Sequence, residues 1–347
     1  MQVGIVGFGA YVPCYRIVAE EIASESGHDI KKINASLAVR EKAVPGKDED
    51  TITIGVQAAK NALLRANINS EKIGAVYVGS ESHPYVVKPS ATIIAAACNI
   101  RENYKAADVE FACKGGTAAL QIGMGLVKAG MVEYALAVGA DTAQAAPRDI
   151  LEFTAGAGGG AFVIGNKLEE MVAVVDDTCS LSSDTPDFWR RSLQKYPEHV
   201  GRFTAEPAYY SHIIRMAEYI LERNSLEASH FSYVVFHQPN GKFPLAVAHK
   251  LGFVKKQYET GLLVQTIGNA YSGSSLLGLN AVLEVANPGE KILLVSYGSG
   301  SGCDAFIMTM QNAVIAKRNL ARSIHSYIQH KKNISYATYR RHSDLIY

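Results

Sequence analysis

The chain has 347 residues, of which 48% are hydrophobic and 19% charged, and its formal net charge is +1. This balance is typical of a globular protein and argues against a nucleic-acid-binding protein or a general attraction to membranes. No apolar run reaches the length of about 18 residues that a membrane-spanning helix needs, and the first residues lack the basic region of a signal peptide. The five cysteines have no Cys-x-x-Cys spacing, which disfavours disulfides and zinc and favours a cytoplasmic, reducing compartment.

The first half of the chain alternates between hydrophobic patterns of strands and of helices. We expect strands at residues 3–7, 73–78, 134–138 and 161–164, and helices across 19–37, 51–65, 90–99 and from the glycines after Cys113 to about 128. Asp50 or Thr51 is expected to cap its helix. The spacing of Gly4, Gly7 and Gly9 does not fit a dinucleotide-binding fingerprint, so we interpret residues 8–10 as a turn.

The second half continues the alternation. Strands are predicted at residues 172–175, 233–236 and 291–295, and helices at about 206–223, from about 241 and from 273. Residues 176–204 have no regular pattern and include Trp189, Arg190 and Arg191, which indicates a loop that covers something. The basic stretch of about 317–347 is interpreted either as a solvated or disordered tail or as a docking segment for a partner.

An internal repeat relates the two halves. Gly116 and Gly273, 157 positions apart, open similar small-residue helices that lead to strands. The same offset places Glu81 within one residue of the counterpart of His237, and Cys113 within one residue of the counterpart of Asn269. The sequence therefore predicts an α/β protein of two duplicated halves, residues 1–168 and 169–312, followed by a basic tail at 313–347.

Cys113 is the candidate nucleophile. It precedes a predicted helix, whose first N–H groups and positive dipole end are expected to lower the pKa of the thiol and favour the thiolate. The two glycines that follow allow a substrate to approach the main chain. The alternative interpretation is a small buried hydrophobic residue before a helix.

Two further candidates follow predicted strands directly, where α/β folds place their ligands. Glu81 is a candidate base for removing a proton next to a carbonyl, and its alternative is a solvated loop carboxylate. His237 is a candidate for stabilising a thiolate or an oxyanion, and its alternative is a satisfied core histidine. Asn269 is either an oxyanion donor or a turn residue, and the glycine-rich turn around Ser299 presents backbone N–H groups.

Five segments together resemble the thiolase superfamily, and within it the hydroxymethylglutaryl-CoA synthases of the short archaeal type. The segments are Gly-Ser-Glu-Ser at 79–82, Ala-Cys-Lys-Gly-Gly-Thr-Ala-Ala-Leu at 112–120, His-Gln-Pro-Asn-Gly-Lys at 237–242, Gly-Asn-Ala-Tyr-Ser at 268–272 and Tyr-Gly-Ser-Gly at 297–300. The resemblance covers essentially the whole chain. It implies a thiolase-like fold, layered α-β-α-β-α.

The resemblance also implies a reaction in the mevalonate pathway of isoprenoid synthesis. Cys113 would take an acetyl group from acetyl-CoA, Glu81 would remove a proton from it, and His237 would assist attack on acetoacetyl-CoA. Water would then release 3-hydroxy-3-methylglutaryl-CoA. The substrates are CoA thioesters, and neither a cofactor nor a metal is implied. The matching substrate and oxyanion positions are Asn269, Ser299, Asp29, Ile30, Thr154 and Thr204, and the matching CoA positions are Lys242 and Arg202.

The resemblance suggests partners and leaves alternatives. It suggests a homodimer formed by pairing edge strands, and a complex with acetoacetyl-CoA thiolase and a small zinc-ribbon/OB-fold protein, to which the basic tail could contribute. β-Ketoacyl-acyl carrier protein synthase III is a close relative that shares the Cys, His and Asn but has no catalytic glutamate at the position of Glu81. A non-catalytic scaffold of thiolase fold is the remaining alternative.

Overall fold

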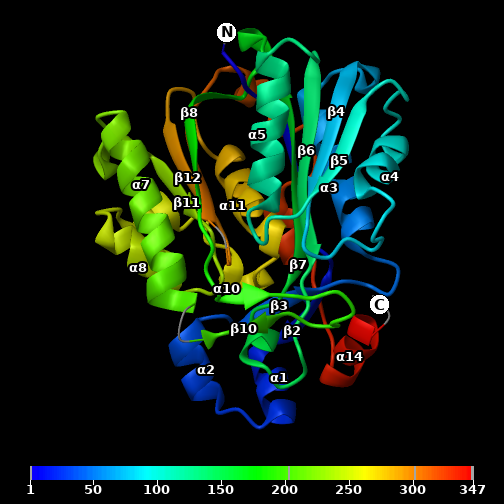
Figure 1. Ribbon diagram of the computed structural model, residues 1–347, viewed down its shortest axis with the longest axis vertical. Coiled ribbons are helices and arrows are strands. Elements are labelled where there is room, and N and C mark those ends of the chain that lie inside the picture. Colours follow the sequence, from blue (N-terminus) through cyan, green and yellow to red (C-terminus); the bar gives the residue numbers. More distant parts are fainter. Residues whose placement is uncertain (1, 202–203, 301, 345–347) are drawn as a thin grey trace.

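The computed structural model describes residues 2–201, 204–300 and 302–344 (Figure 1). A nine-stranded mixed sheet runs through both halves of the chain in the order β11-β12-β13-β8-β1-β7-β6-β4-β5. Its strands are β1 (Gly4–Tyr11), β4 (Ile73–Gly79), β5 (Lys105–Val109), β6 (Tyr134–Thr142), β7 (Ala157–Gly165), β8 (Ala173–Ser182), β11 (Tyr233–Phe236), β12 (Lys291–Gly298) and β13 (Gly302–Met310). Smaller strands are β2 (Tyr15–Val18), β3 (Glu41–Val44), β9 (Phe188–Trp189), β10 (Glu198–His199) and β14 (Lys332–Asn333).

Helices form a middle layer and two outer layers, and the strands of the sheet lie between them, so that the fold is layered α-β-α-β-α. The larger helices are α3 (Thr51–Ala66), α4 (Ser90–Ala97), α5 (Gly115–Lys128), α7 (Ser211–Arg223), α8 (Phe243–Lys250) and α11 (Ser274–Leu283). Helix α5 packs on β4 and β6, α11 packs on β7 and β1, and the two helices touch in the middle layer. Helix α3 packs on β1 and β7 on one outer side, and α7 packs on β13, β12 and β8 on the other (Figure 1). The remaining helices are α1 (Ala19–Ser26), α2 (Ile30–Leu37), α9 (Lys255–Tyr258), α10 (Val264–Ile267), α12 (Ala313–Lys317), α13 (Ile324–Gln329) and α14 (Tyr336–Asp344).

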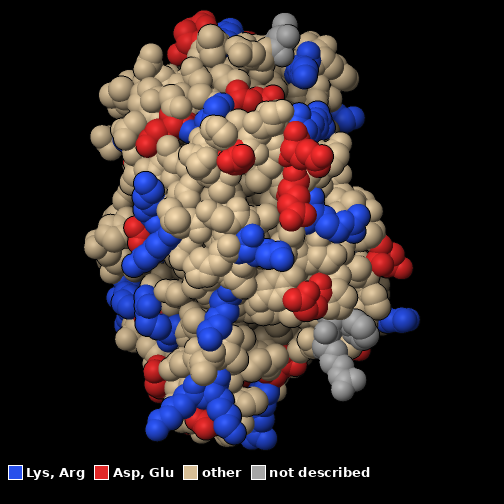
Figure 2. Space-filling model, turned by 90° about the vertical axis from the view of Figure 1, so that its left-hand side faces the viewer, with Lys and Arg blue, Asp and Glu red and all other residues tan. Residues whose placement is uncertain are grey.

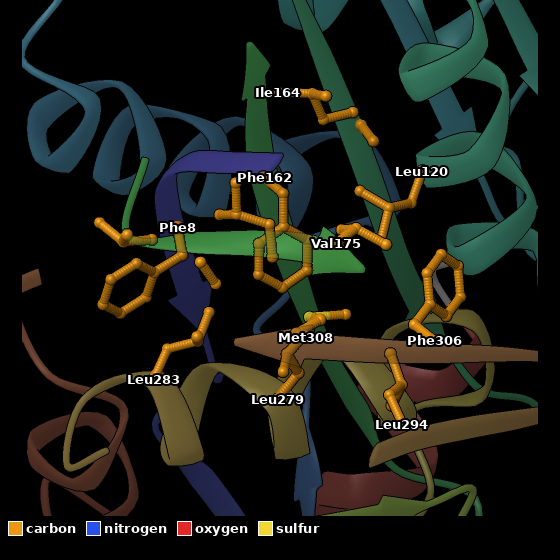
Figure 3. Packing of buried hydrophobic residues seen from close by; sticks show 14 of the residues in the cluster. Phe8, Leu120, Phe162, Ile164, Val175, Leu279, Leu283, Leu294, Phe306 and Met308 are labelled. Carbon is orange, nitrogen blue, oxygen red and sulfur yellow. The ribbon is translucent and has the colours of Figure 1, made fainter. Parts of the chain in front are cut away.

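Strand alternation explains why the sheet is buried on both faces. Ala135 and Ala137 of β6 belong to the core cluster of the middle layer, whereas Leu136 and Val138 belong to the cluster under α3. Successive side chains of a strand point to opposite faces, so one short apolar run serves two cores. Figure 3 shows the middle-layer core, in which Phe8 and Phe162 lie among side chains of the C-terminal half; the latter include Leu279, Leu283, Phe306 and Met308.

The predicted turn at residues 8–10 is wrong, because β1 continues through it to Tyr11. The glycines serve a close approach instead: a Cβ on Gly7 would lie 2.3 Å from the carbonyl oxygen of Ala62, and one on Gly9 would lie 2.2 Å from that of Ala58. Helix α3 therefore lies directly against the backbone of β1. The predicted cap of this helix is confirmed, since the Asp50 side chain accepts a hydrogen bond from the N–H of Thr53.

The expectation of a solvated C-terminal tail is also wrong for the described residues. Strand β14 pairs in parallel with β2, and Lys331 next to it forms an ion pair of 2.6 Å with Glu41. Arg318 donates to the carbonyl oxygen of Ala286 at 2.7 Å, just after α11. The segment is thus part of the folded body. None of the helices in the described residues combines the length and apolar character that crossing a bilayer requires.

Candidate active site

A buried carboxylate fixes the turn that carries Glu81 after strand β4. Asp141, at the end of β6, accepts hydrogen bonds through Oδ1 from the hydroxyls of Ser80 and Ser82, both at 2.6 Å. The same oxygen accepts from the backbone N–H of Glu81 at 2.8 Å. Its Oδ2 accepts from the backbone N–H of Ser272 at 2.7 Å, which ties this turn to the C-terminal half.

Cys113 lies in a tight turn between β5 and helix α5. The residue before it, Ala112, has a φ of 42°, a conformation that side chains seldom adopt and that clusters at functional sites. The hydroxyl of Ser272 donates to the carbonyl oxygen of Ala112 at 2.9 Å and holds the turn from the other half of the chain. A Cβ on Gly79 would lie 2.0 Å from the carbonyl carbon of Gly115, so the end of β4 and the start of α5 are in close contact.

The thiol of Cys113 and the carboxylate of Glu81 lie close enough for each to shift the pKa of the other, and Oε1 of Glu81 has no hydrogen-bond partner within the described residues. Burial, followed by the adjacent charge of Asp141, raises the pKa of Glu81 to about 8. Burial and the carboxylate of Glu81 raise the pKa of Cys113 well above its usual range, although the backbone N–H of Ser299 opposes this. The expected lowering of the thiol pKa is therefore wrong, because desolvation and a neighbouring anion outweigh the helix terminus.

His237 follows β11 directly, as Glu81 follows β4, and it is fully buried. Its backbone is held at both ends: its N–H donates to the carbonyl oxygen of Val295 at 2.9 Å, and its carbonyl oxygen accepts from the hydroxyl of Tyr209 at 2.5 Å. Neither ring nitrogen has a hydrogen-bond partner within the described residues. Burial lowers the pKa of His237 to about 3, so the ring is a neutral imidazole.

Tyr297 connects the histidine to the cysteine. Its ring centroid lies 6.3 Å from that of His237. Burial, the carboxylate of Asp187 and the nearby Cys113 all raise the pKa of Tyr297. The structure therefore brings Glu81 and Cys113 close together, and it places His237 beside Tyr297, whose pKa responds to Cys113.

Asn269 and Thr154 lie on two segments that pair with each other. The N–H of Asn269 donates to the carbonyl oxygen of Thr154 at 2.6 Å, and its carbonyl oxygen accepts from the N–H of Gly156 at 2.9 Å. Its side-chain oxygen accepts from the N–H of Tyr271, the turn role that was its alternative. Ala155, between the paired residues, and Tyr271 both belong to the apolar cluster that surrounds Cys113.

The remaining expected positions lie further from the thiol or are not described. Asp29 caps α2 by accepting from the N–H of Lys31 at 2.9 Å, and Ile30 begins that helix. Thr204 opens the helical turn Thr204–Tyr210, and its hydroxyl donates to the carbonyl oxygen of Val200 at 3.4 Å. Arg202 falls outside the described residues.

Lys242 is exposed at the start of α8. This end of α8 lies beside α2, since the N–H of Gly241 donates to the carbonyl oxygen of Leu37 at 2.7 Å. Figure 2 shows the face of the molecule that carries these helices, and Lys and Arg predominate over Asp and Glu on its lower part. Exposed lysines of these two helices include Lys31, Lys32 and Lys250. Such a surface favours anions, including phosphates.

The predicted irregular loop at 176–204 is partly wrong, because β8 continues through residue 182 and the short strands β9 and β10 follow. The segment after β8 nevertheless covers the site. Asp187 is fully buried and accepts from the N–H of Gly300 at 2.7 Å and from the hydroxyl of Tyr297 at 3.1 Å. Phe188 packs edge-to-face on Tyr271. Arg190 donates to the carbonyl oxygen of Glu81 at 2.7 Å and so joins the segment to the N-terminal half.

Asp141 and Asp187 are the polar side chains of this site that the sequence did not single out. Asp141 follows the predicted strand 134–138 and could have been found by the rule that placed Glu81, since strand ends meet at one edge. Asp187 lies in a stretch without periodicity, and the sequence carries no signal for it.

Comparisons with known proteins show the family and the fold. Residues 107–181 match the family model 3-Oxoacyl-[acyl-carrier-protein (ACP)] synthase III, and residues 221–310 match the model of its C-terminal part. In fold, the chain is similar to MvaS in complex with 3-hydroxy-3-methylglutaryl coenzyme A, with a TM-score of 0.88 and 23% identity over 98% of this chain and 91% of that one. It is also similar to 3-oxoacyl-(acyl carrier protein) synthase III from Pseudomonas aeruginosa PAO1, with a TM-score of 0.81 and 21% identity over 90% of this chain and 99% of that one.

Relatives of higher identity come from archaea. Hydroxymethylglutaryl-CoA synthase of Methanosphaera stadtmanae is 53% identical over 97% of both chains, and that of Methanothermobacter thermautotrophicus is 54% identical over the same shares. The synthase of Pyrococcus furiosus is 54% identical over 98% of this chain and 95% of its own. With more than half of its residues shared over nearly its full length, the chain belongs to the hydroxymethylglutaryl-CoA synthase family.

Proposed function

We propose that the chain condenses acetyl-CoA with acetoacetyl-CoA and water to give 3-hydroxy-3-methylglutaryl-CoA and CoA, as a step of the mevalonate pathway. The observation that carries this proposal is the close approach of the Cys113 thiol and the Glu81 carboxylate, each of which shifts the pKa of the other. A condensing enzyme needs a nucleophile to hold the acyl group and a base next to its methyl group. This pair supplies both in one buried site.

The first step transfers the acetyl group to the enzyme. The sulfur of Cys113 attacks the carbonyl carbon of acetyl-CoA, and the thiol proton passes to the CoA sulfur, which leaves as the free thiol. The N–H of Ser299 lowers the pKa of the thiol, so it lies near the sulfur, and it is proposed to hold the oxygen of the new thioester. Donors of this kind are worth about 3–4 kcal/mol when they meet developing negative charge.

The second step forms the carbon–carbon bond. Glu81, once deprotonated, removes a proton from the acetyl methyl group, and the enolate attacks the ketone carbon of acetoacetyl-CoA. His237 is neutral, so it polarises this ketone through an N–H hydrogen bond. Glu81 then gives the alkoxide the proton that it removed from the methyl group, and water cleaves the thioester to release the product and free Cys113. These steps balance without a cofactor or a metal.

Binding roles extend the proposal to the residues around this pair. Asn269, Thr154, Asp29, Ile30 and Thr204 are proposed to contact the acyl parts of the substrates. Lys242 and Arg202 are proposed to bind the phosphates of CoA, and the exposed Lys242 on a basic surface supports its part.

Assembly and location belong to the same proposal. Strand β5 lies at one edge of the sheet, which supports a homodimer formed by pairing edge strands. A complex with acetoacetyl-CoA thiolase and a small zinc-ribbon/OB-fold protein is proposed from the family resemblance. The five free cysteines suit a cytoplasmic location.

The two matching family models suggest a second candidate function, because both are named after 3-oxoacyl-acyl carrier protein synthase III. A condensing enzyme of that kind would use malonyl-acyl carrier protein and would not depend on Glu81. The contact between Glu81 and the nucleophile favours the first proposal.

A thiol-release assay with acetyl-CoA plus acetoacetyl-CoA tests the function. Wild type is expected to release CoA, and Cys113→Ala and His237→Ala are expected to be inactive or strongly impaired. Glu81→Ala should still form acetyl-enzyme but fail to condense. Activity with malonyl-acyl carrier protein that survives Glu81→Ala would support the second function, and failure of wild type to be acetylated would support a non-catalytic scaffold.

A further inference from the structure

The C-terminal helix α14 sends two tyrosines into buried polar contacts beneath the site. The amine of Lys42, on β3, donates to the hydroxyl of Tyr339 at 3.0 Å and lies 4.4 Å from the centre of its ring. Lys42 is 1% exposed and Tyr339 6%. Glu152 is fully buried, and its carboxylate accepts from the hydroxyl of Tyr336 at 3.1 Å.

These contacts join several segments that are far apart in the sequence. Arg340 of α14 lies 3.8 Å from the carboxylate of Glu152, which also accepts from the N–H of Arg148 at 2.8 Å. Burial lowers the pKa of Lys42 to about 7, and the nearby carboxylate of Glu152 opposes this shift. The cluster therefore links β3, the short helix Ile150–Phe153 and the last helix of the described chain.

The cluster touches the two segments that carry Asn269 and Thr154. A Cβ on Gly268 would lie 2.8 Å from Cβ of Lys42 and 2.6 Å from the carbonyl oxygen of Thr154, so these backbones are packed without spare room. Gly268 has a φ of 74°, which fixes the direction in which Asn269 leaves. Glu152 stands two residues before Thr154, whose carbonyl oxygen accepts from Asn269 at 2.6 Å.

A small cavity of about 20 Å³ lies between α14 and these segments. Tyr339 and Ser343 line it on one side, and Ala145 and Ala155 line it on the other. Both alanines belong to the apolar cluster around Cys113. The same cavity is thus lined both by α14 and by residues of the apolar cluster that contains Cys113.

Stability alone does not account for this cluster. Burying a lysine and a glutamate costs free energy that their attraction only partly returns, and apolar side chains of similar size usually stabilise a core as well or better. Directional hydrogen bonds, in contrast, fix one arrangement of the segments that they join.

We propose that α14, through Tyr339 on Lys42 and Tyr336 on Glu152, holds the paired segments of Asn269 and Thr154 in the geometry that receives acetoacetyl-CoA. Lys42, Glu152, Tyr336 and Tyr339 are positioning residues, and the C-terminal segment is an integral part of the pocket for the second substrate. This inference rests on the proposed function for the identity of that substrate.

The test compares Tyr339→Phe with Tyr134→Phe in the full chain. Tyr134 is a matched control, because its hydroxyl also accepts a hydrogen bond from a lysine, Lys167, at 3.2 Å. This hydroxyl donates to Glu170 as well. Tyr134 lies at the opposite end of β6 from Asp141. Tyr339→Phe is expected to raise KM for acetoacetyl-CoA about tenfold, the effect of one lost hydrogen bond, while acetylation of Cys113 by acetyl-CoA alone stays within about twofold. Tyr134→Phe should change neither quantity.

Hydrogen exchange supplies a measurement that needs no activity. Amides of residues 154–156 and 268–270 should exchange faster in Tyr339→Phe than in wild type, and at the wild-type rate in Tyr134→Phe. Equal losses in acetylation and condensation, or unchanged KM and unchanged exchange, would overturn the proposal. A wild-type chain without synthase activity would overturn the proposed function instead, and the exchange comparison would still decide whether α14 positions these segments.

Discussion

One oxygen of Asp141 accepts the backbone N–H of Glu81 at 2.8 Å, so the proposed base is held by a second, fully buried carboxylate. The other oxygen of Asp141 holds Ser272 in the opposite half of the chain. Asp141 has two effects on Glu81: it fixes the turn in which Glu81 stands, and its charge adds to burial in raising the pKa of Glu81 to about 8.

Asp141→Asn should separate the two effects. Removing the charge lowers the pKa of Glu81, so the acid limb of the condensation rate should move from near pH 8 to lower pH. Since an amide has a single accepting oxygen for the four donors of Asp141, the maximal rate should fall about ten- to a hundredfold. The measurement is the pH profile of condensation by pre-acetylated enzyme, with Asp177→Asn as a control distant from the turn. An acid limb that stays in place would contradict the assigned influence of Asp141.

Glu81→Gln should make the protein more stable at alkaline pH. The folded state raises the pKa of Glu81 from 4.5 to about 8, so between these values the folded chain binds more protons than the unfolded chain. The wild type therefore loses stability as pH rises through this window, and an amide that cannot ionise does not. The variant should match wild type near pH 4 and exceed it by roughly 2–4 kcal/mol near pH 8.5.

Urea unfolding at several pH values measures this difference. Glutamine has nearly the same size and shape as glutamate, so the packing beside Cys113 is not the variable. Glu25→Gln, at an exposed position of α1, is the matched control and should leave the pH dependence unchanged. Parallel pH curves for wild type and Glu81→Gln would argue that the carboxyl is not protonated in the folded chain.

Particular residues show how far the sequence could go. The strands before Glu81 and His237 and the helix after Cys113 followed from periodicity, and the 157-residue repeat predicted that these side chains share one edge of the fold. In the structure Glu81 lies close to Cys113, and His237 lies beside Tyr297, whose pKa responds to Cys113.

Properties that depend on distant neighbours were missed. The thiol pKa was expected to fall because a helix begins after Cys113, but burial and a carboxylate 32 positions earlier in the chain raise it. The glycines of β1 looked like turn residues because the sequence does not show that α3 packs on them. The tail looked solvated because it is rich in basic residues. The sequence does not show that these charges are paired with residues such as Glu41, about 290 positions away.

His237 should show no ionisation in the physiological range. Burial lowers its pKa from 6.5 to about 3, so the imidazole stays neutral from pH 5 to 8. The nitrogen NMR shifts of its ring should therefore remain those of a neutral imidazole down to about pH 4.5, whereas those of exposed His249 provide the comparison. A titration of the His237 ring near pH 6.5 would contradict a neutral donor in the proposed second step.

Lys114, the residue after the nucleophile, should be a main anchor of the turn between β5 and α5. Its amine forms an ion pair of 2.8 Å with Asp304 on β13, and both side chains are almost fully buried. Asp304 also accepts from the hydroxyl of Thr117 at 2.8 Å. Removing one member of such a pair leaves a buried charge without its partner, so Lys114→Met should cost about 3–5 kcal/mol of the free energy of unfolding.

A double-mutant cycle with Asp304→Asn separates this pair from general damage to the core. If the cost comes from the unpaired charge, the double variant should be destabilised by clearly less than the sum of the two single variants. Urea unfolding gives the three free energies, and acetylation of Cys113 by acetyl-CoA reports whether the turn keeps its geometry. Strictly additive losses would show that Lys114 and Asp304 act separately, and that the nucleophile's turn is anchored to the C-terminal half by Ser272 instead.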